Sequence, residues 1–188
     1  MKKMKLIAGL LLTTMGVVST TVCTQNMEVT DFVNEQDRVK VLSMFSDNWQ
    51  WMGMDNAQDT DHLESMYDNS EDDKEGMCYK VIRVKGEVVA FIFYSYDLSF
   101  DCFGACDFTN ACDLTGYISF LVVDSNCHHC GYGKQLMEYA INDMRAHGVT
   151  EISLCTHKDN VVARKLYENK LGFQVEEDDY ISLVLYLA

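Results

Sequence analysis

The sequence contains no proline in its 188 residues, so glycine, asparagine and aspartate must mark the ends of its helices and strands. It also lacks internal repeats and interdomain linkers, which indicates one domain after an unusual first segment. Basic residues are scarce: 15 Lys and Arg stand against 29 Asp and Glu, which excludes nucleic acid as an expected partner. A hydrophobic content of 48% excludes a disordered chain.

Residues 1–26 differ from the rest of the chain. Three lysines precede an apolar run from Leu6 to Val18, and small residues follow, which is the layout of a secretory signal peptide. The run is too short for a comfortable transmembrane helix. We expect export to the periplasm or the medium, or an uncleaved membrane anchor. A cytoplasmic protein with a non-functional signal is the remaining alternative, and residues 27–188 form the domain in each case.

The pattern of apolar residues predicts a mixed α/β domain. Strands are expected at Met27–Phe32, Tyr79–Val84, Val88–Tyr96, Tyr117–Val123, Glu151–Thr156, Phe173–Val175 and Tyr180–Leu187. Helices are expected at Glu35–Met52, Asp61–Tyr67, from Gly131 to Gly148 and from Asn160 to Gly172. The first helix has Val39, Leu42, Phe45 and Trp49 at helical spacing, and the third has Leu136, Met137, Ala140, Ile141 and Met144 on one face.

The segment CHHCGYGK, residues 127–134, joins a buried strand to a helix and allows three interpretations. Cysteine and histidine can ligate zinc, and Cys-x-x-Cys can form a redox pair. A glycine-rich turn before a helix can instead bind phosphate through backbone N–H groups. A zinc site needs further ligands, and Cys102, Cys106 and Cys112 lie roughly 20 Å away along the intervening strand. We therefore favour the phosphate site, expect no metal, and expect a local disulfide or simple packing for Cys127 and Cys130.

Two motifs in the second half resemble the GNAT superfamily of acyl-CoA-dependent N-acyltransferases. The family pattern Arg/Gln-x-x-Gly-x-Gly/Ala falls on His128, Gly131 and Gly133. A later family pattern is matched by Asn160, Ala163, Leu166, Tyr167 and Gly172-Phe173, with one extra residue before the glycine. The resemblance covers residues 115–187. It implies the GNAT fold, in which a central, largely antiparallel sheet splays apart between two strands and is flanked by helices.

The resemblance also implies acetyl-CoA as co-substrate and a set of residues that bind it. The implied binding residues are Leu121, Val122, Val123, His128, His129, Cys130, Gly131, Tyr132, Gly133, Lys134 and Asn160. The N–H of Leu121 or a neighbour would polarise the thioester carbonyl, and Tyr167 would protonate the departing thiolate. Without the motif, Tyr167 would be read as a core aromatic residue.

The general base departs from the family pattern. Many relatives carry glutamate at positions that correspond here to Tyr117 and Cys155, and neither is a good base. We predict His157 in this role, although it could equally be a surface residue. Asp124, a water chain, or a substrate that arrives already neutral are the alternatives.

Acidic stretches suggest the acceptor. In the implied fold, Asp55, Asp59, Asp61 and Glu64 in one loop and Glu176 to Asp179 in another flank the acceptor groove. They predict a cationic primary amine, such as a polyamine, an amine-bearing small molecule or a basic peptide, unless the charge only provides solubility. The predicted function is N-acetyl transfer to this amine. The alternatives are a catalytically inactive GNAT-like binding module, exported or tethered, and a structural domain stabilised by disulfides or zinc. In the three-cysteine turn we expect a Cys102–Cys112 disulfide, and a homodimer is left open.

Overall fold

The computed structural model describes residues 27–51, 76–96, 114–177 and 181–187. Several predictions lie outside these ranges: the signal-like segment, the helix at 61–67, the Cys102–Cys112 disulfide, and most of the two acidic stretches. None of the helices in the described ranges has the length and apolar character needed to cross a membrane.

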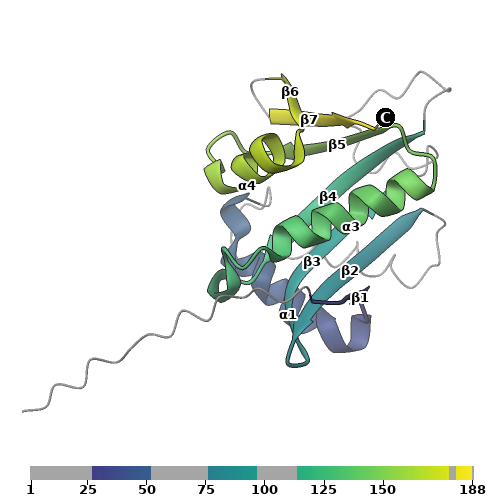
Figure 1. Cartoon of the computed structure of the whole chain (residues 1–188). Coiled ribbons are helices and arrows are strands. Elements are labelled where there is room, and N and C mark those ends of the chain that lie inside the picture. Colours follow the sequence, from purple (N-terminus) through teal and green to yellow (C-terminus); the bar gives the residue numbers. More distant parts are fainter. Residues whose placement is uncertain (1–26, 52–75, 97–113, 178–180, 188) are drawn as a thin grey trace, which may run out of the picture.

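One sheet forms the centre of the described domain, in the order β1-β2-β3-β4-β5-β7-β6 (Figure 1). The strands are β1 Val29–Asp31, β2 Met77–Val84, β3 Glu87–Ser95, β4 Thr115–Val123, β5 Glu151–Thr156, β6 Gln174–Glu177 and β7 Ile181–Tyr186. The pairing of β4 with β5 is parallel, and the other pairings are antiparallel. The predicted mixed, largely antiparallel architecture is confirmed.

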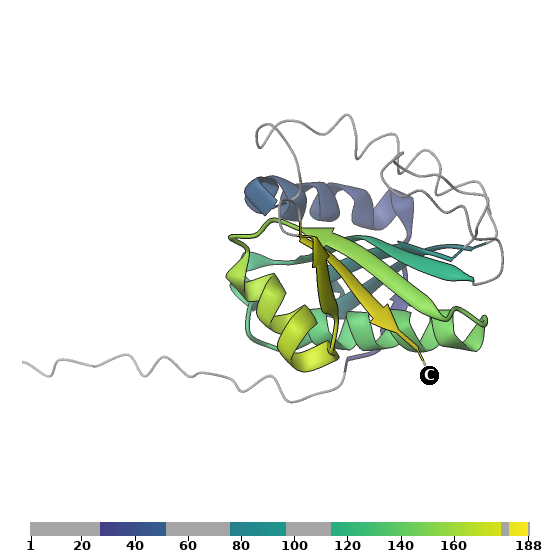
Figure 2. The same cartoon turned by 90° about the horizontal axis from the view of Figure 1, so that it is seen from above.

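Helices cover both faces of this sheet. They are α1 Asn34–Asp47, α3 Tyr132–Ala146 and α4 Val161–Leu166, with short turns η1 Trp49–Trp51 and η2 Ser125–Cys127 and a π-helical segment η3 Tyr167–Leu171. Helix α1 lies on one face of the sheet, and α3 and α4 lie on the other (Figure 2). The two faces therefore have separate hydrophobic cores.

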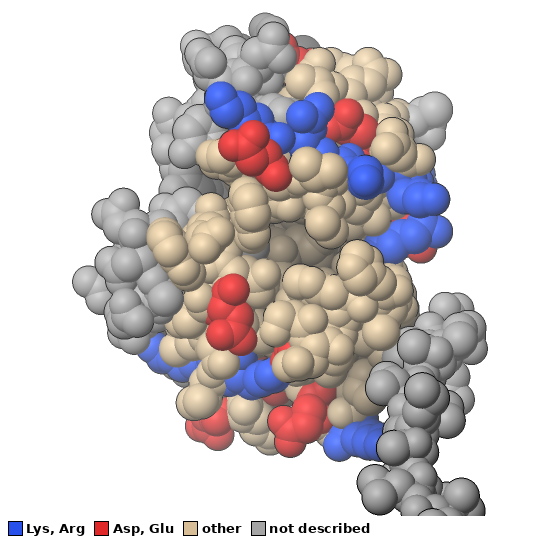
Figure 3. Space-filling model, turned by 90° about the vertical axis from the view of Figure 1, so that its left-hand side faces the viewer, with Lys and Arg blue, Asp and Glu red and all other residues tan. Residues whose placement is uncertain are grey.

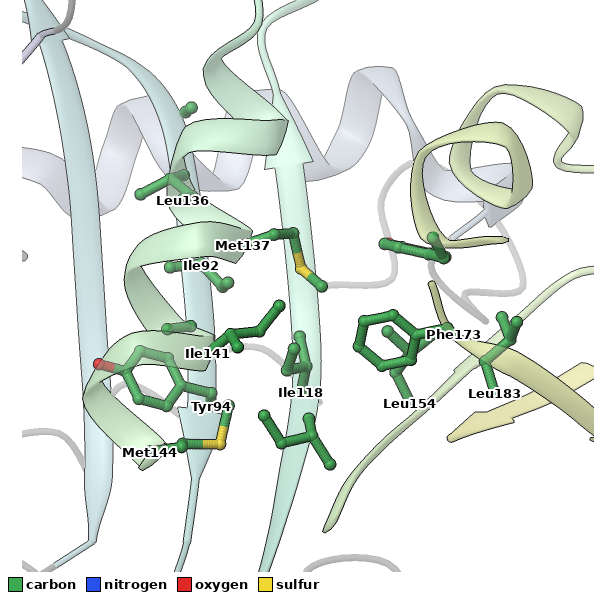
Figure 4. Packing of buried hydrophobic residues seen from close by; sticks show 14 of the residues in the cluster. Ile92, Tyr94, Ile118, Leu136, Met137, Ile141, Met144, Leu154, Phe173 and Leu183 are labelled. Carbon is green, nitrogen blue, oxygen red and sulfur yellow. The ribbon is translucent and has the colours of Figure 1, made fainter. Parts of the chain in front are cut away.

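The core beneath α3 follows the predicted apolar face. The five residues predicted to face inward, Leu136, Met137, Ala140, Ile141 and Met144, are all buried. Figure 4 shows several of them over the sheet, near Ile92 of β3 and Ile118 of β4. Burying a side chain of this size stabilises the fold by about 1.5–3 kcal/mol. The helix approaches β4 closely: a Cβ at Gly116 would lie 2.3 Å from the sulfur of Met144, so a larger residue there would force the buried Met144 side chain to move.

The core beneath α1 differs from the sequence prediction. The buried apolar residues of the helix are Val41, Met44 and Phe45, whereas Val39 is 80% exposed. The 41, 44, 45 spacing is the i, i+3, i+4 pattern of one helical face, and position 39 lies on the opposite side. The helix also ends at Asp47, earlier than predicted, and the chain continues as the separate turn η1.

Strand β4 changes its alternation at a β-bulge. Phe93 pairs with Phe120 and Tyr94 pairs with Ile118, so Ser119 is an extra residue in the ladder. Ile118 packs in the core beneath α3, whereas Phe120 packs in the core beneath α1. A bulge bends its strand and redirects the side chains and backbone groups that follow.

Beyond this bulge, β4 and β5 part. Their pairing runs from Thr115 opposite Glu151 only as far as Ile118 opposite Leu154. Strand β4 continues to Val123, while β5 continues to Thr156 alongside β7. The backbone of β4 facing β5 is therefore left without a strand partner over its last residues, and the predicted splay in the sheet is confirmed.

Candidate active site

A pocket of about 670 Å³ opens where β4 and β5 separate. Figure 3 views the molecule from the side of the β4–α3 loop and shows a hollow, with Lys and Arg side chains gathered above it. The pocket is lined by Asn48, Trp51, Leu121, Val122, Val123, Cys127, His128, His129, Gly131, Tyr132, Gly133, Lys134, Asp159, Asn160, Val161, Val162, Ala163, Lys165, Leu166, Tyr167 and Lys170. These residues come from both helical layers, so the pocket reaches both faces of the sheet.

The structure brings most of the predicted site residues together. Every residue predicted to bind the co-substrate lines this pocket except Cys130, which packs partly buried against the core beneath α3. Tyr167 lines the pocket as well, whereas His157 does not. What each of these residues does there stays a prediction.

The phosphate loop, residues 127–134, is shaped by its backbone. His129 and Gly131 have φ angles of 64° and 86°, in the left-handed region. Histidine reaches this region at some cost, and glycine reaches it without a Cβ penalty. The first hydrogen bond of α3 runs from Gln135 N to Gly131 O at 3.0 Å, so the N–H groups before it have no carbonyl partner within the helix. The helix dipole makes this end favourable for an anion.

Gly133 keeps the space beside this loop open. A Cβ at this position would lie 3.5 Å from Val123 and 3.7 Å from Leu166, which is ordinary contact. A longer side chain would have to extend into the gap between β4 and α4. The loop therefore fits a phosphate group of a ligand that continues into the splay.

Lysine side chains add positive charge to the pocket. Lys134 lies in the first turn of α3, and Lys165 and Lys170 lie on α4 and η3. Lys134 forms a 3.0 Å salt bridge with Glu138, and both side chains are about half exposed. The chain carries a net charge of −14, yet this part of its surface offers cations to an anionic ligand.

His128 occupies the place of the family's Arg or Gln. Its Nε2 lies 3.1 Å from the backbone oxygen of Val123. The ring therefore supports the junction between β4 and the phosphate loop.

Asp124 fixes the start of the phosphate loop. Its carboxylate accepts hydrogen bonds from Asn126 N at 2.9 Å and Asn126 Nδ2 at 3.1 Å, and it forms an ion pair with Lys40 of α1. The hydrogen bond from Lys40 lowers the pKa of Asp124. Because the carboxylate is a weakened base and does not line the pocket, the structure disfavours it as the general base.

Tyr167 begins the π-helical segment η3. The extra residue before Gly172 in the family pattern is accommodated here, because a π-helix holds one more residue per turn. The side chain is 7% exposed, and burial raises the pKa of the phenol, which is therefore neutral at physiological pH. Its ring lies 6.0 Å from that of Phe173.

His157 lies near the α1 end of the pocket. Its Nδ1 accepts a hydrogen bond from Asp159 N at 3.2 Å, and its ring contacts that of Trp51. Cys155, at one of the family's glutamate positions, is exposed, and Tyr117, at the other, is partly buried.

The cysteine and histidine residues of the loop form no disulfide or metal cluster in the described part of the chain. Cys127 and Cys130 are thiols that pack against the core beneath α3, so of the two predicted alternatives the structure has packing and not the local disulfide. No group of three metal-ligating side chains occurs among the described residues.

Sequence analysis missed part of the pocket. Ala163 and Leu166 belong to the quoted family pattern, so the α4 wall could have been predicted from it. Asn48 and Trp51 carry no such signal, because their place at the pocket depends on how a distant segment packs.

Comparison with known proteins agrees with this geometry. GCN5-related N-acetyltransferase 6, chloroplastic, from Arabidopsis thaliana is 34% identical over 62 residues, which is 33% of this chain and 21% of that protein. Uncharacterized N-acetyltransferase YhdJ from Bacillus subtilis is 35% identical over 60 residues, 32% of this chain and 42% of that protein. The matched region thus spans about a fifth and about two fifths of these curated relatives.

A solved structure shares the fold over nearly the whole domain. The PaiA N-acetyltransferase from Thermoplasma acidophilum, in complex with coenzyme A, superposes with a TM-score of 0.67 at 17% identity, covering 87% of this chain and 100% of that one. The family model described as Acetyltransferase (GNAT) family matches residues 40–173, which is well over half of the sequence. With the splayed sheet, the glycine loop and the buried tyrosine in place, the chain belongs to the GNAT family of acetyltransferases.

Proposed function

We propose that this protein transfers the acetyl group of acetyl-CoA to a primary amine. The observation that carries the proposal is the pocket itself, which joins a glycine-rich loop at a helix N-terminus, an open strand edge and a buried phenol in one continuous space. The structural neighbour with coenzyme A has the same fold, which supports this choice of co-substrate.

The pocket fits the parts of acetyl-CoA in chemical terms. The N–H groups of the first turn of α3, with Gly131 and Gly133, would hold the pyrophosphate, and Lys134 would add charge. The pantetheine arm carries amide groups, and the strand edge of Leu121 to Val123 offers backbone partners where β5 has turned away. Asn160 lines the same space, and its Oδ1 caps α4 by accepting from Ala163 N at 3.2 Å.

The transfer requires a neutral amine beside the thioester. Bound acetyl-CoA supplies the acetyl group: a C–N bond forms, the C–S bond breaks, and the proton lost by the nitrogen balances the one gained by sulfur. The N–H of Leu121 or a neighbour, redirected by the bulge at Ser119, would stabilise the charge on the carbonyl oxygen. The phenol of Tyr167 retains its proton at neutral pH and would donate it to the thiolate.

The proton acceptor for the amine is a separate proposal. His157 is our candidate, acting through water because it does not line the pocket and its Nδ1 already accepts a hydrogen bond from Asp159 N. The test is the pH dependence of kcat/KM for His157→Gln. Loss of the acidic limb of the profile would support this role, and an unchanged profile would exclude it.

We also propose that the acceptor is cationic and that residues 1–26 direct the protein out of the cytoplasm or anchor it. The net charge of −14 supports the first proposal, which predicts that KM for the amine rises with ionic strength. The lysines and the apolar run of the first segment support the second. Cell fractionation of the full chain tests it: recovery only in the cytosol would overturn it.

Calorimetric titration of acetyl-CoA into the reduced full chain is the first test of the proposed function, followed by an amine screen. Binding with turnover of a primary amine is expected. A folded protein that does not bind acetyl-CoA would overturn the proposal. Binding without turnover of any amine would favour the alternative, a GNAT-like binding module.

A further inference from the structure

The α1 end of the pocket carries an aromatic surface that acetyl transfer itself does not use. Trp51, the last residue of η1, lines the pocket and keeps 38% of its surface exposed. Its backbone N–H donates to the backbone oxygen of Asn48 at 2.9 Å, and the backbone N–H of Asn48 donates to the backbone oxygen of Phe45 at 2.9 Å. These bonds connect η1 to the end of α1, so the indole is presented by a hydrogen-bonded turn. A tryptophan held in this way offers a large contact area to a ligand.

His157 contacts Trp51. The two rings meet edge to face, with centroids 5.9 Å apart and planes at 61°. The hydrogen bond from Asp159 N to Nδ1, at 3.2 Å, orients the imidazole. His157 is absent from the pocket lining, whereas Trp51 and Asp159, on either side of it, both line the pocket.

Asp159 places negative charge beside this aromatic surface. Its carboxylate is 71% exposed, with Oδ2 3.8 Å from His157 Nδ1. An indole face attracts a cation through its quadrupole, and a carboxylate adds Coulomb attraction. The lysines that line the pocket lie elsewhere: Lys134 is in the first turn of α3, Lys165 is on α4 and Lys170 is on η3. The Trp51 end is therefore the part of the lining suited to a positive group.

We propose that Trp51 and Asp159 form a subsite for a second, non-reacting ammonium group of the acceptor. This inference rests on the proposed acetyl transfer. The nitrogen that attacks must be neutral, so it cannot be the cation that this subsite holds. A second nitrogen in the same molecule supplies that charge and takes no part in the bond changes. The preferred acceptor class is therefore a diamine or a longer polyamine, in which the subsite positions one end while the other is acetylated.

The test compares 1,4-diaminobutane with 1-aminobutane, which has the same carbon chain but one nitrogen. N-acetyl products are quantified by mass spectrometry for the wild type and for Trp51→Leu, Trp51→Phe and Asp159→Asn. Tyr186→Leu is the matched control, because this aromatic residue is 58% exposed and lies outside the pocket. Calorimetry with acetyl-CoA checks that each variant keeps a folded site.

We expect Trp51→Leu to lower kcat/KM for the diamine about ten-fold, the loss of one cation–π contact, and Asp159→Asn to lower it about three-fold. Trp51→Phe retains most of the activity. In Trp51→Leu and Asp159→Asn, kcat/KM falls less for the monoamine than for the diamine, and each variant still binds acetyl-CoA. Tyr186→Leu keeps the wild-type kcat/KM for both amines.

Three results would overturn the subsite. Equal losses for both amines in Trp51→Leu would mean that Trp51 only shapes the pocket, and acetyl transfer would stand. Equal use of both amines by the wild type would show that no second charge is recognised. A wild-type protein that binds acetyl-CoA but acetylates no amine in a broad screen would remove the proposed function, and the subsite with it.

Discussion

The two ends of the pocket are built in contrasting ways. The phosphate end comes from one continuous stretch, residues 121–134, and it offers mainly backbone groups. The α1 end comes from Trp51 and from the turn after β5, which are far apart in the chain, and it offers side chains. Binding through backbone groups should tolerate a substitution unless the new side chain fills the space for the ligand. Binding through side chains should weaken when a single side chain is truncated.

The largest effect is expected from filling the phosphate end. Gly133→Glu places a carboxylate in the gap bordered by Val123 and Leu166, where it occupies space and repels phosphate. We expect acetyl-CoA binding to weaken by more than about 100-fold, the loss of several charge-assisted hydrogen bonds. Calorimetry measures it. Asn142→Glu, which adds the same charge to α3 outside this pocket, is the control and should bind as the wild type does. Wild-type affinity in Gly133→Glu would place the phosphate elsewhere.

Tyr167→Phe separates chemistry from binding. Removing only the hydroxyl should lower kcat about 100-fold, the lower range for a general acid, and leave the Kd for acetyl-CoA unchanged. The buried ring would keep its contact with Phe173, so the melting temperature should change little. Single-turnover kinetics give the rate of the chemical step. A kcat close to that of the wild type would show that Tyr167 is only a core residue.

Lys40 connects helix α1 to the start of the phosphate loop, because its ammonium group pairs with Asp124. Lys40→Met leaves that carboxylate, 10% exposed, without its cation. We expect the Kd for acetyl-CoA to rise about five-fold. We expect the free energy of unfolding to fall by only about 1–2 kcal/mol, because Lys40 is partly exposed and its ion pair is screened by solvent. Lys40→Arg should restore most of the affinity. A lower melting temperature with an unchanged Kd would mean that the pair stabilises the fold without positioning the loop.

The same pair predicts a pH dependence of stability. The pKa of Asp124 is lowered in the folded protein, so the stabilisation is present above the ordinary pKa of aspartate, about 3.9, and is lost as the pH falls through the lower folded value. The stability difference between wild type and Lys40→Met should therefore be full at neutral pH and shrink under acid. Urea unfolding at several pH values measures it. A constant difference would contradict the assignment.

The smallest effect is expected from His128→Gln, which restores a family residue at the phosphate end. Its ring contacts Val123 O, and in the proposed function backbone groups hold the anion. The Kd for acetyl-CoA should change by less than about three-fold, which is under 1 kcal/mol. A ten-fold change in this Kd would show that side chains contribute substantially to binding at the phosphate end, against the proposed contrast between the two ends.

The sequence predicted the strand–loop–helix unit around residues 127–134 because its signals are local. Glycine at 131 and 133 marks where the backbone must turn and stay open, and the five-residue apolar face of α3 follows from helical periodicity. The extra residue before Gly172 was visible in the sequence, but only the structure shows it as a π-helical turn. Val39 was assigned to the wrong face because apolar spacing alone does not decide which face of a helix meets the sheet.

By itself, the sequence determined the mixed α/β class, the strand–loop–helix unit and the likeness to the GNAT family, since each depends on residues close together in the chain. Only the tertiary structure decided that Trp51 and Asp159 share a pocket, that Lys40 pairs with Asp124, and that β4 and β5 part after Ile118. These features join segments separated by tens of residues or more. The first two form because the α1 layer packs on the sheet, and the third coincides with the bulge in β4, so no local periodicity encodes which groups then meet.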